Sequence, residues 1–293
     1  MTTQVDYLLF DVFTDVAFAG NPLAIFPEAG FDDATMQKVA RELNLSETVF
    51  LSRGTPGAAG ILRIFTPGRE VLFAGHPTIG TAIALVDHLH WSDPNESSFL
   101  LRLPIGDVPI AIERDDPTTA WLTTPPVTFG REIAREDAAA ILCVGQADVR
   151  GDLPSQMVGA GNPFLYVPLA SKAAVDRAVL DVSAVRAQLG WDDINGIYFF
   201  AQTDDGAYAR MFAPMSGIAE DPATGSATGP LYAYLARCGA LARKERFVNE
   251  QGVAMGRRSV IHVRLHWNGD VPEGIEIGGN AVFVGEGRLR VPG

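Results

Sequence analysis

The stretch EDPATGSATG, residues 220–229, has the composition of a helix start. Asp221 is a residue type that caps helices, Pro222 fits a first helical turn, and the glycines allow close approach to the backbone. A similar stretch, AGHPTIGTA, occupies residues 74–82. Helix N-termini present unpaired N–H groups and a partial positive charge, so each stretch predicts a place where a carboxylate can bind. The alternative is that Asp221 and His76 only cap helices and that the glycines serve only packing.

Three short motifs occur twice in the same order. AGNPLAIF returns as AGNPFLYV, RIFTP returns as RMFAP, and HPTIGTA returns as DPATGSA. Ordered repetition indicates tandem duplication, and each copy reads as a β-rich unit with one buried, glycine-started helix. We therefore predict two similar domains, residues 1–126 and 127–293, joined by a linker at the PP pair and the VTFGREIA that follows it. Whether the final strand packs back on the first domain stays open.

The composition limits the classes of partner. The chain has 293 residues, of which 47% are hydrophobic and 20% charged, which is typical of a globular protein. Its net charge of −12 argues against nucleic acid or an anionic membrane as partner. The N-terminal MTTQVDYLLFDVFTD shows no export signal or membrane span, so we expect a cytoplasmic protein.

Two further local features give expectations. Cys143 and Cys238 stand in apolar, helix-like segments, which favours buried thiols in a reducing compartment. Gly229-Pro230 lies inside the second glycine-started helix and should kink or break it.

The differences between the two copies point to the chemistry. Aligning ELNLSETVF with QLGWDDINGIYF places Glu47 opposite Asn195, and the repeated helix starts place His76 opposite Asp221. The site would then hold one carboxylate at position 47 in place of a symmetric pair. An acid flanked by apolar residues can be partly desolvated, which suits acid–base work. Taken singly, Glu47 could equally be an exposed helix-end carboxylate and Ser226 a packing residue.

Several of these stretches together resemble the PhzF-like (phenazine biosynthesis) family. They are DVFTDVAFAGNPLAIF, LNLSETVFLS, RIFTPGREVLFAGHPTIGTA, FAPMSGIAEDPATGSATGPL and NEQGVAMGRRS, and they span most of the chain. The resemblance implies an α+β fold of the diaminopimelate-epimerase-like type. Such a fold has two pseudo-symmetric domains, each a β-barrel-like sheet around a central helix, with the site in the cleft between them. It also implies no metal, no organic cofactor and a homodimer.

The resemblance also implies roles for single residues. It makes Glu47 the acid–base group and His76 and Asp221 the groups that contact the substrate and share its proton traffic. Substrate-binding positions in the two glycine-rich stretches are Gly75, Gly225 and Ser226. The family's named activity is the isomerisation of trans-2,3-dihydro-3-hydroxyanthranilate, in which a proton leaves C3 and returns at C1 on the same face. The implied partner is thus a small-molecule carboxylate.

Three rival functions remain. An amino-acid epimerase or racemase of the same fold would use two opposed cysteines, whereas neither glycine-rich stretch contains a cysteine. A non-catalytic protein that binds small carboxylates is compatible with the sequence, although the set Glu47, His76, Asp221 and Ser226 argues for an active site. A phosphate-binding enzyme is disfavoured because the glycine-rich turns lack the lysine of a P-loop.

Overall fold

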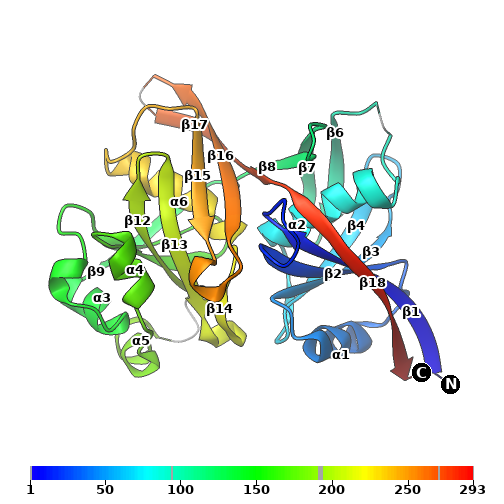
Figure 1. The fold of residues 1–293 in the computed structure, drawn as a ribbon, viewed down its shortest axis with the longest axis horizontal. Coiled ribbons are helices and arrows are strands. Elements are labelled where there is room, and N and C mark those ends of the chain that lie inside the picture. The colour runs from blue at the N-terminus through cyan, green and yellow to red at the C-terminus, as the bar shows by residue number, and fades with distance from the viewer. Residues whose placement is uncertain (1, 94, 191–193, 270, 293) are drawn as a thin grey trace. The chain divides into compact units, whose positions relative to one another are not determined.

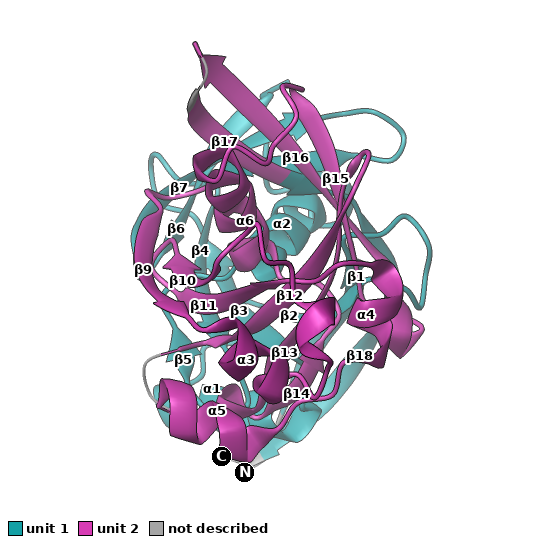
Figure 2. Cartoon of the chain, turned by 90° about the vertical axis from the view of Figure 1, so that its left-hand side faces the viewer, with its two compact units in different colours: residues 1–123, 278–293 teal, residues 124–277 magenta. Residues whose placement is uncertain are grey.

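The computed structural model describes residues 2–93, 95–190, 194–269 and 271–292 (Figure 1). The chain divides into two compact units, which Figure 2 distinguishes by colour. The first unit comprises Met1–Thr123 with Gly278–Gly293, and the second comprises Thr124–Ile277. The C-terminal residues therefore group with the first half of the chain.

The first unit is a strand-rich unit with two α-helices. Its elements are β1 (Thr2–Val12), β2 (Asn21–Pro27), α1 (Asp33–Leu43), β3 (Glu47–Arg53), β4 (Gly60–Phe65), β5 (Glu70–Val71), α2 (Gly75–Ile83), a π-helical turn (Ala84–His88), β6 (Ser98–Leu103), β7 (Gly106–Glu113), β8 (Thr119–Thr123) and β18 (Ala281–Pro292). The strands pair in the order β18–β1–β2–β3–β4–β6–β7–β8. Two of these pairs, β2 with β3 and β4 with β6, are parallel, and the others are antiparallel.

The second unit repeats this plan. Its elements are β9 (Thr128–Ile133), α3 (Arg135–Ile141), β10 (Ser155–Gly159), β11 (Pro163–Pro168), α4 (Lys172–Arg177), α5 (Val182–Leu189), β12 (Gly196–Thr203), β13 (Gly206–Ala213), β14 (Ile218–Asp221), α6 (Gly225–Arg237), β15 (Arg246–Gln251), β16 (Ser259–Asn268) and β17 (Val271–Gly279), with 3₁₀ turns at Gln146–Asp148, Pro214–Ser216 and Val253–Met255. The strands pair in the order β9–β10–β11–β12–β13–β15–β16. The parallel pairs, β11 with β12 and β13 with β15, take the same places in this order as in the first unit. The pairing order agrees with the duplication that the repeated motifs predict.

One helix in each unit is buried against the sheet. All nine residues of α2 are buried, and the helix packs on β1, β2, β3 and β8. This close approach requires glycine at Gly80, because a Cβ there would lie 2.6 Å from Cγ2 of Val12. The equivalent helix α6 packs on β10 and β16. Because these helices are apolar on most faces, their burial contributes much of the hydrophobic stabilisation of each unit.

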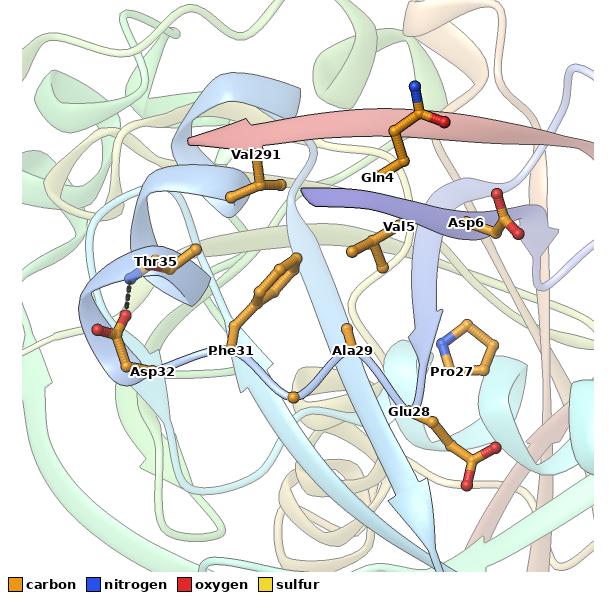
Figure 3. A pocket seen from close by; sticks show the side chains of 11 residues that line it. Gln4, Val5, Asp6, Pro27, Glu28, Ala29, Phe31, Asp32, Thr35 and Val291 are labelled. Carbon is orange, nitrogen blue, oxygen red and sulfur yellow. Dashed lines mark hydrogen bonds between the residues drawn. The ribbon is translucent and has the colours of Figure 1, made fainter. Parts of the chain in front are cut away.

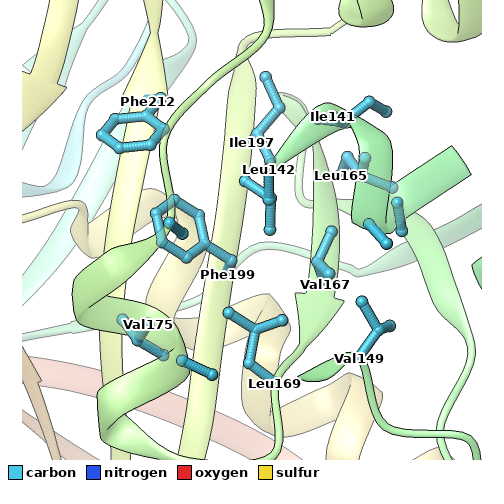
Figure 4. Close-up of a cluster of buried hydrophobic side chains, with 14 of the residues drawn as sticks. Ile141, Leu142, Val149, Leu165, Val167, Leu169, Val175, Ile197, Phe199 and Phe212 are labelled. Carbon is cyan, nitrogen blue, oxygen red and sulfur yellow. The ribbon is translucent and has the colours of Figure 1, made fainter. Parts of the chain in front are cut away.

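Successive strand side chains point alternately toward this buried helix and toward a second layer of helices on the other face of the sheet. In the second unit, Leu165, Val167, Ile197 and Phe199 face a core cluster with α3, α4 and α5 (Figure 4). Tyr166 lies between two of these residues and points the other way, where its hydroxyl donates to the α6 carbonyl of Ala227 at 2.6 Å. Strands buried on both faces read as continuous apolar runs, which explains IYFFA and FLYV.

Three sequence expectations need correction. VTFGREIA is not a linker, because residues 128–133 within it form strand β9. Pro230 does not end α6, which runs through it to Arg237, since a proline near the helix start removes one backbone hydrogen bond only. Cys143 is exposed and Cys238 half-buried, because both lie just past a helix C-terminus: Cys238 is the C-cap of α6, and Cys143 follows the C-cap of α3.

Candidate functional site

The first unit gathers three polar side chains where two parallel strands begin. Asn21 is the first residue of β2, Glu47 is the first residue of β3, and Leu23 pairs with Glu47 across the two strands. Alternate residues of a strand point to the same side, so Glu47 shares the face of Val49. Phe50 points to the opposite face, where it packs in a hydrophobic cluster with buried residues of α1. His76 lies in the first turn of α2.

The side chains of Glu47 and His76 form a close pair with little exposure to solvent. His76 Nδ1 lies 3.1 Å from Glu47 Oε2, and the exposed fractions of the two side chains are 3% and 17%. Asn21 is also buried, and its Nδ2 lies 3.4 Å from the same ring nitrogen. A carboxylate held beside an imidazole with little water around it is an arrangement that can accept and return a proton.

The second ring nitrogen of His76 is the unusual feature of this cluster. Nε2 is buried and has no hydrogen-bond partner among the residues that the structure describes. The tautomer in which Nδ1 donates to Glu47 leaves the lone pair on Nε2. Because a buried polar atom without a partner costs about 1–3 kcal/mol, it marks a position where a ligand group would be stabilised.

The second unit gathers a different polar cluster in front of α6. The hydroxyl of Thr224 donates to Asp221 Oδ2 at 2.6 Å. Gln251 Nε2 donates to the carbonyl of Asp221 at 2.7 Å and to Thr224 Oγ1 at 2.9 Å, while Gln251 Oε1 accepts from the amide of Thr224 at 3.2 Å. Asp221, Thr224 and Gln251 are all buried. The loop that enters α6 is therefore held in one conformation by side-chain hydrogen bonds.

Two more buried side chains extend this cluster. Asn249 Nδ2 donates to the hydroxyl of Tyr198 at 2.7 Å, and that hydroxyl donates to Gln251 Oε1 at 3.4 Å. Burial raises the pKa of Tyr198 to about 12, so the phenol keeps its proton at neutral pH. Tyr198 can accordingly act as a donor throughout the physiological range.

The helix start in this unit is at Gly225 and Ser226. The first backbone bond of α6 runs from the amide of Ala227 to the carbonyl of Thr224, so the amides of Gly225 and Ser226 precede it. Ser226 is half-buried. Asp221 does not cap this helix, which corrects the expectation from the sequence: it ends β14, and Thr224 occupies the N-cap position.

Strand register corrects the matching of the two halves. Leu23 pairs with Glu47 in the first unit, and the repeated motif places Phe164, which pairs with Gly196, at the corresponding position of the second. Glu47 is thus equivalent to Gly196 and not to Asn195.

The second matching also shifts. Ile64 pairs with Val71, and its equivalent Met211 pairs with Asp221, so Asp221 corresponds to Val71. The helices begin at Gly75 and Gly225, which makes Ser226 the equivalent of His76. The shift arises because nine residues separate Met211 from its partner Asp221, whereas six separate Ile64 from Val71, and the β13–β14 pairing contains a register irregularity. The conclusion that position 47 has no carboxylate opposite it is unaffected.

Each predicted site residue falls in one of the two clusters. Glu47, Gly75 and His76 belong to the first unit, and Asp221, Gly225 and Ser226 belong to the second. The neighbours of these residues were not predicted from the sequence; they are Asn21, Tyr198, Thr224, Asn249 and Gln251. The signal was available for three of them: Asn21 stands in the repeated AGNP motif, and Asn249 and Gln251 stand in NEQG.

A separate cavity of about 910 Å³ opens in the first unit (Figure 3). Its lining includes the β1 residues Val5 and Asp6, the loop before α1, and Val291 of β18. Its three carboxylates already have partners, since Asp6 pairs with Arg288, Glu28 pairs with Arg53, and Asp32 accepts from the amide of Thr35. None of the predicted site residues lines this cavity.

Neither a metal-ligand cluster nor a membrane-spanning helix occurs within the described ranges. Within residues 2–93, 95–190, 194–269 and 271–292, three or more His, Cys, Asp or Glu side chains nowhere come together as a metal site would require. Over the same part of the chain, every helix is too short or too polar to span a bilayer.

Comparison with known proteins identifies relatives over nearly the whole chain. A family model described as phenazine biosynthesis-like protein matches residues 10–287. The trans-2,3-dihydro-3-hydroxyanthranilate isomerase of Pseudomonas chlororaphis is 34% identical over 285 residues, which cover 97% of this chain and 98% of the relative.

The solved structures similar to this one include a PhzF-family protein and an epimerase. A PhzF-family phenazine biosynthesis protein from Bacillus anthracis superposes with a TM-score of 0.88 at 24% identity, covering 98% of this chain and 99% of that chain. A hydroxyproline epimerase from Agrobacterium vitis gives a TM-score of 0.65 at 13% identity, covering 98% and 92%. At these identities the likeness establishes the fold, a mixed α+β fold that PhzF proteins share with racemases and epimerases.

Proposed function

Because the chain belongs to the PhzF family and is an isomerase of that family, we propose that it moves a proton on a small cyclic carboxylate, with Glu47 as its single acid–base group. The reference substrate is trans-2,3-dihydro-3-hydroxyanthranilate, because a relative 34% identical to this chain is named as the isomerase of this compound. The proposal includes the finer fold that the family implies, in which two barrel-like domains each surround a central helix and both contribute to one substrate site. It assumes no metal and no organic cofactor.

The proton shift needs one group that accepts and then donates. The Glu47 carboxylate takes the proton from C3, the electron pair of the broken C–H bond moves into the conjugated ring system, and Glu47 returns the proton at C1. No oxidant or reductant takes part, since substrate and product are isomers. His76 Nδ1, 3.1 Å from Glu47 Oε2, holds one oxygen of the carboxylate in place during both steps.

The remaining groups hold the substrate. The unpartnered Nε2 of His76 receives a polar substituent of the ring, and Asp221 receives the substrate's amino or hydroxyl group. The amides of Gly225 and Ser226 with the Ser226 hydroxyl bind the substrate carboxylate. A helix N-terminus stabilises an anion by about 0.3–2 kcal/mol, which suits a protein whose net charge of −12 repels anions at long range.

One observation carries the proposal. A half-buried carboxylate and a buried imidazole lie in contact in the first unit, whereas the equivalent positions in the second unit are Gly196 and Ser226. A mechanism with one base per half has no second base at those positions. The same observation argues against the two-thiol epimerase mechanism, because Cys143 and Cys238 both lie at helix C-termini and outside both clusters.

The proposal is tested by following trans-2,3-dihydro-3-hydroxyanthranilate with the purified enzyme by NMR and chromatography, without added metal or cofactor. We expect conversion to an isomer of the same mass. In parallel, L-proline, trans-4-hydroxy-L-proline and diaminopimelate are incubated in heavy water, and we expect no exchange of their α-protons. Exchange of an amino-acid α-proton without conversion of the dihydro compound would establish the epimerase alternative. Failure of every compound to react would overturn the proposed substrate class.

A further inference from the structure

The side-chain amide of Gln251 has its orientation set by its neighbours. Gln251 has an exposed fraction of 0%. The carbonyl of Asp221 can only accept a hydrogen bond, and it lies 2.7 Å from one end of the amide. The backbone N–H of Thr224 can only donate, and it lies 3.2 Å from the other end. The nitrogen must therefore face Asp221 and the oxygen must face Thr224.

This orientation decides where the hydroxyl proton of Thr224 points. Gln251 Nε2 also donates to Thr224 Oγ1 at 2.9 Å, so that oxygen acts as an acceptor. The single hydrogen of the hydroxyl is then directed to Asp221 Oδ2 at 2.6 Å. Upstream, Asn249 donates to Tyr198, whose hydroxyl donates to Gln251 Oε1. The side-chain bonds from Asn249 through Tyr198, Gln251 and Thr224 therefore each point toward the Asp221 carboxylate, while the Thr224 amide donates back to Gln251.

The fold does not require this polar series. In the first unit the register places apolar residues at the equivalent positions, with Leu101 opposite Gly60 where Asn249 lies opposite Ala207. The same register makes Leu103 the equivalent of Gln251, and the matched helix starts make Ala74 the equivalent of Thr224; all three apolar residues are buried. Burying polar groups costs free energy unless each is satisfied, so a network found in only one copy points to a use beyond packing.

We propose that Gln251 is a positioning residue that acts through the Thr224 hydroxyl to fix the rotation of the Asp221 carboxylate and to present it as a hydrogen-bond acceptor. Because Gln251 also holds the amide of Thr224, it fixes the residue immediately before the α6 amides of Gly225 and Ser226. The inference rests on the proposed function in one respect, namely that Asp221 contacts the substrate.

Two substitutions of Thr224 separate positioning from packing. Thr224→Val keeps the volume and removes the hydroxyl, whereas Thr224→Ser keeps the hydroxyl and removes a methyl group. With trans-2,3-dihydro-3-hydroxyanthranilate as substrate, we expect Thr224→Val to lower kcat/KM by about tenfold to a hundredfold and Thr224→Ser by about threefold or less, because hydrogen bonds to charged groups are the strong ones. A role in packing alone predicts the reverse order, with the smaller serine the more damaging, and that result would overturn the inference.

A double-mutant cycle with Asp221→Asn tests whether the effect passes through Asp221. We expect Thr224→Val to add nothing once Asp221 is replaced, since residues in one network are not additive. Multiplication of the two single losses would show that Thr224 acts elsewhere, and the positioning role would be abandoned.

The hydrogen bonding of the Gln251 amide can be measured without any substrate. In NMR spectra of the wild-type protein, we expect the side-chain NH₂ protons of Gln251 to exchange slowly with water and to shift in Thr224→Val but not in Thr224→Ser. Rapid exchange in the wild type would refute the positioning role alone. A wild-type turnover rate for Asp221→Asn would instead defeat the proposed contact between Asp221 and substrate, so the two failures are distinguishable.

Discussion

The two halves of the chain share strand order and register but differ in where they place buried polar groups. The first half has Glu47 and His76 where the second has Gly196 and Ser226. The second half has Asp221, Thr224 and Gln251 where the first has the apolar residues Val71, Ala74 and Leu103. One backbone plan therefore occurs twice, and it carries an acid–imidazole pair in one copy and a hydrogen-bond network in the other.

Other features have stayed the same in both copies. Arg63 pairs with Glu70 through two hydrogen bonds of 2.8 and 2.7 Å, and Arg210 pairs with Glu220 through two of 2.8 Å. Each pair joins the end of one strand to the short strand that follows it. What both copies keep is structural, and what only one copy has is a candidate for function.

The largest expected effect tests the assignment of the proton transfer to the first half. Glu47→Gln keeps the size and removes the carboxylate, so we expect kcat to fall by at least the upper end of the roughly 10²–10⁴-fold range of general acid–base groups. Steady-state kinetics with trans-2,3-dihydro-3-hydroxyanthranilate measure this. The control is Glu42→Gln, which changes an exposed glutamate of α1 and should leave kcat unchanged. A Glu47→Gln enzyme within about threefold of wild type would remove Glu47 from the mechanism.

The conserved ion pairs allow a comparison of stability. Arg210 is more buried than Arg63, with side-chain exposures of 10% and 31%, and it also donates to the carbonyls of Val175, Asp176 and Ala178. We expect Arg210→Met to lower the free energy of unfolding by about 3–5 kcal/mol, because Glu220 and these carbonyls lose their partner. Arg63→Met should cost about 1 kcal/mol. Urea unfolding of both variants measures the difference, and equal losses would show that burial does not distinguish the two pairs.

The repeated AGNP motif provides a matched pair of asparagines. Asn21 is buried beside His76, whereas Asn162 is half-buried in the turn between β10 and β11. Asn21→Ala should reduce kcat/KM by about tenfold, because the loss of its buried side chain lets the His76 ring shift relative to Glu47. Asn162→Ala is the control in the same motif and should leave kcat/KM near the wild-type value. Similar losses in both variants would mean that the motif serves the turn and not the site.

The smallest expected effect concerns the holding of the substrate by the second half. Ser226→Ala removes one hydroxyl and keeps the α6 amides, so we expect KM to rise by about fivefold with little change in kcat. Initial rates over a range of substrate concentrations separate the two constants. A fall in kcat with KM unchanged would place Ser226 in the chemical step.

The sequence predicted much of this arrangement and misjudged its alignment. The repeats AGNP and RIFTP/RMFAP gave the duplication because strand residues buried on both faces tolerate few replacements. Matching HPTIGTA with DPATGSA gave the wrong alignment of His76. Gly, Thr, Ala and Pro suit any helix start, so the two stretches can be aligned in more than one register. The register is set by the strand pairs of Val71 and Asp221, which no local pattern reveals. The contact of Gln251 with Thr224 joins β15 to α6 and likewise depends on tertiary packing.

The central claim is that the first half performs the proton transfer and the second half holds the substrate. A crystal structure of Glu47→Gln with intact trans-2,3-dihydro-3-hydroxyanthranilate tests it most directly, because an inactive variant keeps the substrate unreacted. We expect C3 to lie in van der Waals contact with the side chain at position 47 and the carboxylate to accept hydrogen bonds from the amides of Gly225 and Ser226. A substrate bound the other way, with its carboxylate at the start of α2 and C3 against Asp221, would contradict the division of roles.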